Sequence, residues 1–163
     1  MTNEATWHAR AVTDGDTILA TADITASPER VFRALTTEEA ERWWGSPDIY
    51  RVTDWQADVR VGGLWSLIVR RPDGGIFPAS GEFLAVNAPG KIVQTRKYNW
   101  DCPELGRRDT TVTYRLDPIA TGTRMTVRHD GFVGLRESAD EHAAGWERFL
   151  NWLTAYLNPD LRS

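Results

Sequence analysis

His129 is the side chain whose type and position best suit chemistry inside a cavity. It continues the two-residue spacing of Met125 and Val127, which in a strand puts all three side chains on one face. An imidazole on that apolar face has three interpretations: a histidine bonded to a backbone carbonyl or a hydroxyl, a ligand anchor, or an acid or base. Tyr114, in another expected strand, could share an acid–base role.

Arg96 could bring a positive charge into the same interior. It shares the parity of Ile92 and Tyr98, which would make it a buried partner for the carboxylate of a ligand. The opposite register, with Val93 and Thr95 inward, would place Arg96 in water. The sequence leaves both registers open.

The sequence matches no established catalytic template. It has no G-x-S-x-G elbow, no phosphate-binding glycine loop and no G-x-G-x-x-G after a strand. The three histidines, His8, His129 and His142, lack the spacing of metal ligands, and Cys102 is the one cysteine. Acidic neighbours also disfavour a nucleophilic Cys102. We therefore expect no metal, no cofactor and no cysteine chemistry.

Eight tryptophans are the most unusual feature of the composition. An indole suits a core, an interface or the wall of a ligand cavity equally well. Two expected strands carry inward rows, Trp65, Leu67 and Val69 in one and Val112, Tyr114 and Leu116 in the other. Such rows serve plain core packing as well as ligand contact. The residues that we expect to bind a ligand are Trp44, Trp65, Leu67, Arg96, Tyr98, Tyr114, His129, Trp146 and Phe149.

The bulk composition predicts one soluble globular domain. The chain has 163 residues, of which 41% are hydrophobic and 26% charged. Its first sixteen residues lack the apolar stretch of a signal peptide, and no window is long and apolar enough to span a membrane. A single cysteine suits a reducing cytoplasm. We expect an N-terminal extension over 1–15, one domain over 16–158 and a tail over 159–163.

The charge distribution argues against nucleic acid as a partner. The net charge is −4, and the basic pairs are limited to Arg70-Arg71 and Arg107-Arg108. Binding a phosphate backbone needs a basic face or stripe, which this pattern does not supply.

The first part of the chain predicts a strand followed by two short helices. Residues 16–26 alternate as in a half-buried strand. Ser27 can cap a helix whose first residue is Pro28. Thr36 and Glu39 have capping-box spacing, which predicts a second helical turn or two.

Six further strands should follow, separated by turn residues in the pattern of an antiparallel meander. They lie near 50–60, 63–71, 76–87, 91–100, 109–117 and 122–131. The connection from Trp100 to Arg108 is the longest irregular one, and we interpret it as a candidate gate at the end of the sheet.

The last expected element is a long amphipathic helix over about 139–157, with Ser138 and Glu141 as a capping box. Its apolar face carries Ala143, Trp146, Phe149, Leu150, Leu153 and Leu157. We expect the opposite face, with Ala144, Glu147, Arg148 and Asn151, to be solvated.

Together these elements predict an α+β fold in which a curved seven-stranded antiparallel sheet wraps around the C-terminal helix. Twist and curvature should leave a gap between helix and sheet at one end, closed by the two short helices. A small-molecule site would form in that gap.

Five segments resemble one superfamily: ASPERVFRALTTEEAERWWG (26–45), VGGLWSL (61–67), GEFLAVNAPGKIV (81–93), GTRMTVRHDGF (122–132) and GWERFLNWLTAYL (145–157). It is the helix-grip superfamily of START-like (SRPBCC) proteins, which includes the steroidogenic-acute-regulatory-related lipid-transfer domain, the birch-pollen allergens and the polyketide cyclases. Within it, the chain resembles the branch named after the activator of the heat-shock protein 90 ATPase. The resemblance implies a sheet that grips the C-terminal helix around a hydrophobic cavity.

The leading hypothesis is a protein that binds a small hydrophobic or amphipathic molecule in this cavity. An enzyme of the polyketide cyclase or dehydratase kind, using His129 and Tyr114, is the alternative. A co-chaperone-like interaction protein is the second alternative, and it would require an exposed apolar patch. The sequence also allows a homodimer.

Overall fold

The computed structural model describes residues 9–158, which form nine strands and three helices. The strands are β1 (Arg10–Asp14), β2 (Thr17–Ile24), β3 (Gly45–Ser46), β4 (Tyr50–Ala57), β5 (Leu64–Arg70), β6 (Ile76–Asn87), β7 (Lys91–Tyr98), β8 (Thr110–Ile119) and β9 (Gly122–Asp130). The helices are α1 (Pro28–Thr36), α2 (Ala40–Trp43) and α3 (Arg136–Leu157). The element order is the one that the sequence predicts, with two additional strands.

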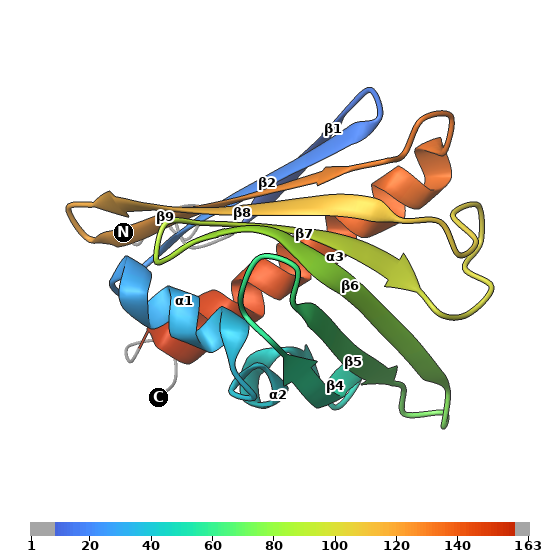
Figure 1. Ribbon diagram of the computed structural model, residues 1–163, viewed down its shortest axis with the longest axis horizontal. Helices are drawn as coiled ribbons and strands as arrows, with labels where there is room; N and C mark the ends of the chain where they lie inside the picture. Colours follow the sequence, from blue (N-terminus) through green and yellow to red (C-terminus); the bar gives the residue numbers. More distant parts are fainter. Residues whose placement is uncertain (1–8, 159–163) are drawn as a thin grey trace, which may run out of the picture.

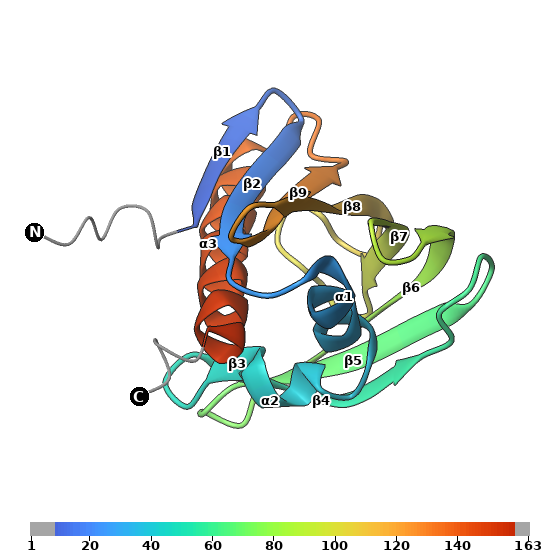
Figure 2. The same cartoon turned by 90° about the vertical axis from the view of Figure 1, so that its left-hand side faces the viewer.

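The strands make one antiparallel sheet in the order β1-β2-β9-β8-β7-β6-β5-β4-β3. Figure 1 shows α3 crossing the sheet, and Figure 2 shows the sheet curling from β1 and β2 around to β5 and β4, with α3 along the open side and α1 in the mouth. This arrangement confirms the predicted helix grip.

The sheet has nine strands where we predicted seven. The first additional strand, β1, lies within the segment predicted as an extension and pairs with β2, while the second, β3, has only two residues. Neither segment is long or regular enough to show a two-residue period. Residues 1–8 of the predicted extension and the predicted tail, 159–163, lie outside the described residues.

The helix α1 begins as predicted. The Ser27 side chain accepts a hydrogen bond from the Arg30 backbone N–H at 3.2 Å, and Pro28 is the first helical residue. Val31, Ala34 and Leu35 are buried. Their burial fixes the helix in the mouth of the curled sheet (Figure 2).

The capping box predicted for α2 is wrong. The Thr36 hydroxyl donates to the Phe32 carbonyl at 2.7 Å, back into α1. Thr37 Oγ1 accepts the Glu39 N–H at 3.3 Å in the turn before α2, and no side chain caps the helix at its N-cap residue, Glu39. The short helix then ends at Trp43, whose indole N–H donates to the Ala34 carbonyl at 3.0 Å.

The helix α3 begins two residues before the predicted cap, at Arg136, so the capping box of Ser138 and Glu141 is also wrong. The Ser138 backbone N–H donates to the carboxylate of Glu104, which belongs to the connection between β7 and β8. A carboxylate at this position stabilises the positive end of the helix dipole. A distant loop therefore caps α3.

The helix face that we predicted to be solvated is partly covered by the first strand. The Asn151 side chain accepts the Ala9 N–H, and the Glu147 side chain accepts the Ala11 N–H, both at 2.9 Å. Ala144 is the exposed member of the predicted set, whereas Glu147, Arg148 and Asn151 are partly buried. For Glu147 and Asn151 the prediction failed because it did not include the segment that contains β1, whereas Arg148 lies in the wall of a cavity on another side of the helix.

Candidate functional site

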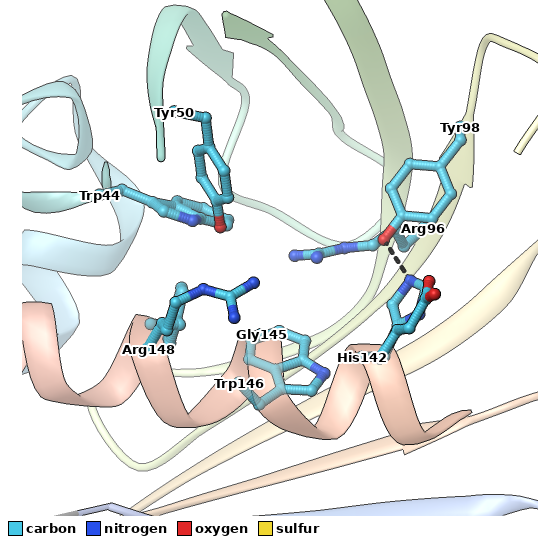
Figure 3. Close-up of a pocket in the computed structure, with 10 residues that line it drawn as sticks. Trp44, Tyr50, Arg96, Tyr98, His142, Gly145, Trp146 and Arg148 are labelled. Atoms are coloured by element: carbon cyan, nitrogen blue, oxygen red, sulfur yellow. Dashed lines mark hydrogen bonds between the residues drawn. The ribbon is translucent and has the colours of Figure 1, made fainter. Parts of the chain in front are cut away.

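A cavity lies between the N-terminal half of α3 and the part of the sheet formed by β4 to β7 (Figure 3). It has two lobes, of about 230 Å³ and about 380 Å³. Six wall residues belong to both lobes: Trp44, Tyr50, Arg96, Tyr98, Glu141 and His142. The two volumes therefore adjoin across these side chains.

The two lobes differ in their remaining walls. The smaller one, which we call the arginine lobe, is completed by Gly145, Trp146, Arg148 and Phe149 of α3. The larger one, which we call the aromatic lobe, is completed by Trp65, Leu67, Val69, Arg71, Phe77, Ala79, Trp100, Cys102 and Pro103. The wall of the aromatic lobe is predominantly apolar with a few polar groups, which is typical of small-molecule sites.

Arg96 projects from β7 into the cavity (Figure 3) and is only 8% exposed. Its guanidinium carbon lies 4.9 Å from the ring centroid of Trp146 and 5.6 Å from those of Trp44 and Trp65. Cation–π attraction to three indoles stabilises a desolvated cation. Among residues 9–158 no ion pair includes Arg96, and its Nε and Nη2 have no hydrogen-bond partner.

Phenol oxygens surround the same guanidinium. Burial opposes the charge on Arg96, but the oxygens of Tyr114 and Tyr98, a hydrogen bond between Arg96 and Tyr98, and a smaller effect of Tyr50 raise its pKa overall. Burial also raises the pKa of Tyr50 and Tyr98, and it raises that of Tyr114 to about 12. The three phenols are neutral near pH 7, so they offer dipoles to Arg96 but no opposite charge.

Trp65 is held in the cavity wall by a hydrogen bond that passes over a neighbouring strand. Its indole N–H on β5 donates to the Thr95 carbonyl on β7 at 3.0 Å, across Gly81 of β6. A Cβ at Gly81 would lie 1.9 Å from that carbonyl oxygen and 2.5 Å from the indole nitrogen. Glycine is therefore required there, and the bond fixes the Trp65 ring beside Arg96.

Tyr98 and His142 form a hydrogen-bonded pair in the wall between the lobes (Figure 3). His142 Nδ1 lies 2.8 Å from the Ser138 carbonyl, which can only accept, so Nδ1 carries the hydrogen. Nε2 then accepts the Tyr98 hydroxyl at 2.9 Å. Burial, supported by the charge of Arg96 and opposed by the bond to Ser138, lowers the pKa of His142 to about 4. A neutral phenol and a neutral imidazole therefore meet at the cavity.

His129 is fully buried beneath Trp146 and lies outside the cavity wall. Its Nδ1 accepts the Trp146 indole N–H at 3.0 Å, so its Nε2 carries the hydrogen and donates to Thr110 Oγ1 at 2.7 Å. The Thr110 hydroxyl donates in turn to the Arg96 carbonyl at 3.1 Å. Burial, and then the charge of Arg96, lower the pKa of His129 well below its usual value. This chain of bonds positions the Trp146 ring and the Arg96 backbone.

Arg148 brings a second guanidinium into the arginine lobe from α3. Its Nε is buried and has no hydrogen-bond partner. Figure 3 shows the guanidinium groups of Arg148 and Arg96 directed into the same space between helix and sheet. Tyr50 borders this space from β4 and packs edge-on against Trp152, with ring centroids 5.4 Å apart. Two cationic groups therefore share one small lobe.

The connection between β7 and β8, predicted as a gate, borders the aromatic lobe. Trp100, Cys102 and Pro103 lie in the wall, and Glu104 ties the loop to the first turn of α3. Burial, and then the charge of Glu141, raise the pKa of the Cys102 thiol. A thiol in this state is a poor nucleophile, and the loop is anchored at its centre.

Seven of the nine predicted ligand-binding residues line the cavity: Trp44, Trp65, Leu67, Arg96, Tyr98, Trp146 and Phe149. Tyr114 and His129 are buried outside it, and Tyr114 stacks on Phe149 with ring centroids 6.0 Å apart. The structure therefore separates the two side chains named for acid–base chemistry from the cavity. Of the two registers left open for β7, the observed one has Ile92, Gln94 and Arg96 buried.

Five wall residues of the arginine lobe were not predicted from the sequence: Tyr50, Glu141, His142, Gly145 and Arg148. His142 lies four residues before Trp146 and seven before Phe149, and this helical spacing could have placed it on the same face. Arg148 was assigned to a solvated face. No sequence signal distinguished Tyr50, because it is the first residue of its strand.

The described part of the chain contains neither a cluster of metal ligands nor a membrane-spanning helix. Within residues 9–158, no three or more His, Cys, Asp or Glu side chains are grouped so as to hold a metal ion. In the same range, no helix is both long and apolar enough to cross a membrane.

Solved structures from three bacteria share the fold. A protein from Chromobacterium violaceum has a TM-score of 0.77 and 24% identity, over 89% of this chain and 99% of that one. A protein from Rhodobacter sphaeroides has a TM-score of 0.79 and 19% identity, over 92% and 97%. One from Mycobacterium smegmatis has a TM-score of 0.76 and 21% identity, over 91% and 96%. No curated protein matches the chain significantly.

A family model covers most of the chain. The model described as Activator of Hsp90 ATPase homolog 1-like protein matches residues 25–158. That range includes the three helices, β3 to β9 and every wall residue of the cavity. The chain therefore belongs to the family of Activator of Hsp90 ATPase homolog 1-like proteins.

Proposed function

We propose that this protein binds a small hydrophobic or amphipathic molecule in the two lobes between α3 and the sheet. The observation that carries the proposal is the pair of adjoining volumes, of about 230 and 380 Å³, with tryptophan in both walls. Protein cores are packed as densely as organic crystals and leave few voids larger than a water molecule. Together the two lobes fall within the range of volumes that is typical of ligand sites.

A ligand screen read out by isothermal titration calorimetry tests the proposal. The panel contains fatty acids, aromatic acids, aromatic amides and polyketides, and Trp44, Trp65 and Trp146 supply intrinsic fluorescence as a second readout. We expect at least one class to bind with a stoichiometry near one and to quench tryptophan fluorescence. If no member of the panel binds, the proposed function is wrong.

A cavity-filling variant locates the binding. Ala79 lies in the wall of the aromatic lobe, so Ala79→Leu should place three more carbon atoms there and weaken binding. Ala144→Leu makes the same change on the exposed face of α3 and should leave binding unchanged. If Ala79→Leu does not fold, Val69→Phe tests the same lobe from β5. Equal affinity of the folded filling variant and wild type would contradict binding in this cavity.

A second candidate function is an enzyme that uses the same cavity. The observation that favours it is the pair of Tyr98 and His142, a donor and a base at 2.9 Å in the cavity wall. His129 and Tyr114 lie outside that wall. A bound molecule that the protein converts would identify the reaction, and Tyr98→Phe should then lower turnover more than binding. Unchanged turnover in this variant would remove the pair from any mechanism.

A further inference from the structure

We propose that the arginine lobe binds the carboxylate of an aromatic acid, with the ring system of the acid in the aromatic lobe. This inference rests on the proposed function and adds the charge and the shape of the ligand. The inference depends on Arg96 and Arg148, whose guanidinium groups both enter the arginine lobe. Each of these groups has at least one buried nitrogen without a hydrogen-bond partner.

The two unpartnered nitrogens of Arg96 lie on one edge of its guanidinium. Nε–H and an Nη2–H point in parallel from that edge, and a carboxylate accepts such a pair with its two oxygens. The indole rings of Trp44, Trp65 and Trp146 stabilise the positive charge, but a π face does not replace a hydrogen-bond acceptor for each N–H. This edge of Arg96 therefore has the geometry of a carboxylate site.

Arg148 strengthens the preference for an anion. Its buried Nε has no partner either, and Figure 3 shows its guanidinium on the helix side of the space that Arg96 enters from the sheet. The acidic residue of the lobe wall is Glu141, which is exposed, and no ion pair among residues 9–158 includes Glu141, Arg96 or Arg148. The lobe therefore has an excess of positive charge.

The aromatic lobe favours a flat, apolar body for the ligand. Trp44, Trp65, Phe77 and Trp100 all lie in its wall and present ring faces or edges for offset stacking. Its volume of about 380 Å³ suits a ring system of two or three fused rings. An aromatic acid can place its rings here while its carboxylate reaches Arg96, because Arg96 belongs to the walls of both lobes.

A matched pair of probes tests the charge preference. 1-Naphthaleneacetate carries a carboxylate, and 1-naphthaleneacetamide has nearly the same shape without the charge. In calorimetric titrations of the full chain at pH 7 and low salt, we expect the acid to bind about thirtyfold more tightly than the amide or better. Equal affinities for the acid and the amide would overturn the inference and leave the proposed function standing.

Variants assign the preference to the arginines. Arg96→Met should remove most of the thirtyfold difference by weakening the acid alone, and Arg148→Met should reduce it by a smaller factor. Retained binding of the amide shows that each variant is folded. Arg115→Met is the control, because it removes the same charge from an exposed position on β8 and should change either affinity less than about twofold.

The remaining outcomes also decide the inference. If Arg115→Met weakens binding of the acid as much as Arg96→Met does, the acid responds to the net charge of the protein. This result would contradict a site at Arg96. Failure of both naphthalene probes, while other members of the ligand panel bind, would also contradict an aromatic acid. Failure of the whole panel would instead count against the proposed function.

Discussion

Mild acid should destabilise this protein through its two buried histidines. His142 bonds to Ser138 and Tyr98 in its neutral form, and His129 is neutral between Trp146 and Thr110. Burial lowers the pKa of both imidazoles, to about 4 for His142. In the unfolded chain each imidazole takes up a proton near pH 6.5. As the pH falls, the unfolded chain therefore binds these protons at a higher pH than the folded protein does, and this difference favours unfolding.

The size of the effect follows from the pKa of His142. The unfolded state binds more protons than the folded state between pH 6.5 and about pH 4, so the free energy of unfolding falls as the pH falls through this range. At about 1.36 kcal/mol per pH unit, His142 alone costs about 2 kcal/mol between pH 6.5 and pH 5. His129 adds a loss of the same sign. The lowered pKa values of Asp23 and Asp130 act only below their usual value of 3.8, outside this window.

Urea unfolding at pH 7.0, 6.5, 6.0, 5.5 and 5.0, followed by tryptophan fluorescence, measures this loss. His142→Gln keeps a polar side chain that does not titrate, so it should reduce the loss between pH 6.5 and 5 by about 2 kcal/mol. Proton NMR of the wild type should show no protonation of either buried ring above pH 5. A flat wild-type profile, an unchanged slope in His142→Gln, or a His142 midpoint near 6.5 would refute the reasoning.

Three further substitutions test how the site is held. Gly145→Ala in α3 should raise the free energy of unfolding by about 1 kcal/mol in urea titrations, because its Cβ would meet only an Arg148 nitrogen at 3.7 Å; destabilisation would contradict this. Glu104→Ala removes the acceptor at the start of α3 and should cost about 1 kcal/mol in the same assay, whereas a cost near zero would mean that the loop does not cap the helix. Gly81→Ala should lower the free energy of unfolding by about 3 kcal/mol and change the fluorescence of Trp65, since the new Cβ would displace either the indole or the β7 backbone. Wild-type stability of this variant would show that the hydrogen bond from Trp65 to the Thr95 carbonyl does not require glycine at this position.

The sequence predicted most of the fold because its strands and helices follow simple periods. Buried and exposed residues alternate along β2 as predicted, and the predicted apolar face of α3 is buried except at Ala143. Capping was predicted less well, since no side chain caps α2 and the distant Glu104 caps α3 in place of the predicted capping box. A capping contact between segments 34 residues apart has no local signal. The position of Arg148 in the cavity wall was missed because a helix wheel does not show which other elements pack against each face of the helix.

Parity along a strand decides whether a side chain faces inward, but not whether it meets a cavity. Arg96, Tyr114 and His129 all face the interior from the neighbouring strands β7, β8 and β9. Over β8 and β9, Trp146 and Phe149 of α3 cover Tyr114 and His129, which become packed core. Over β4 to β7 the sheet curls away, and Arg96 faces open volume. The distance of each strand from the gripped helix therefore separates core from site, and Arg96, which lies at this boundary, is the residue on which we expect ligand selectivity to depend most.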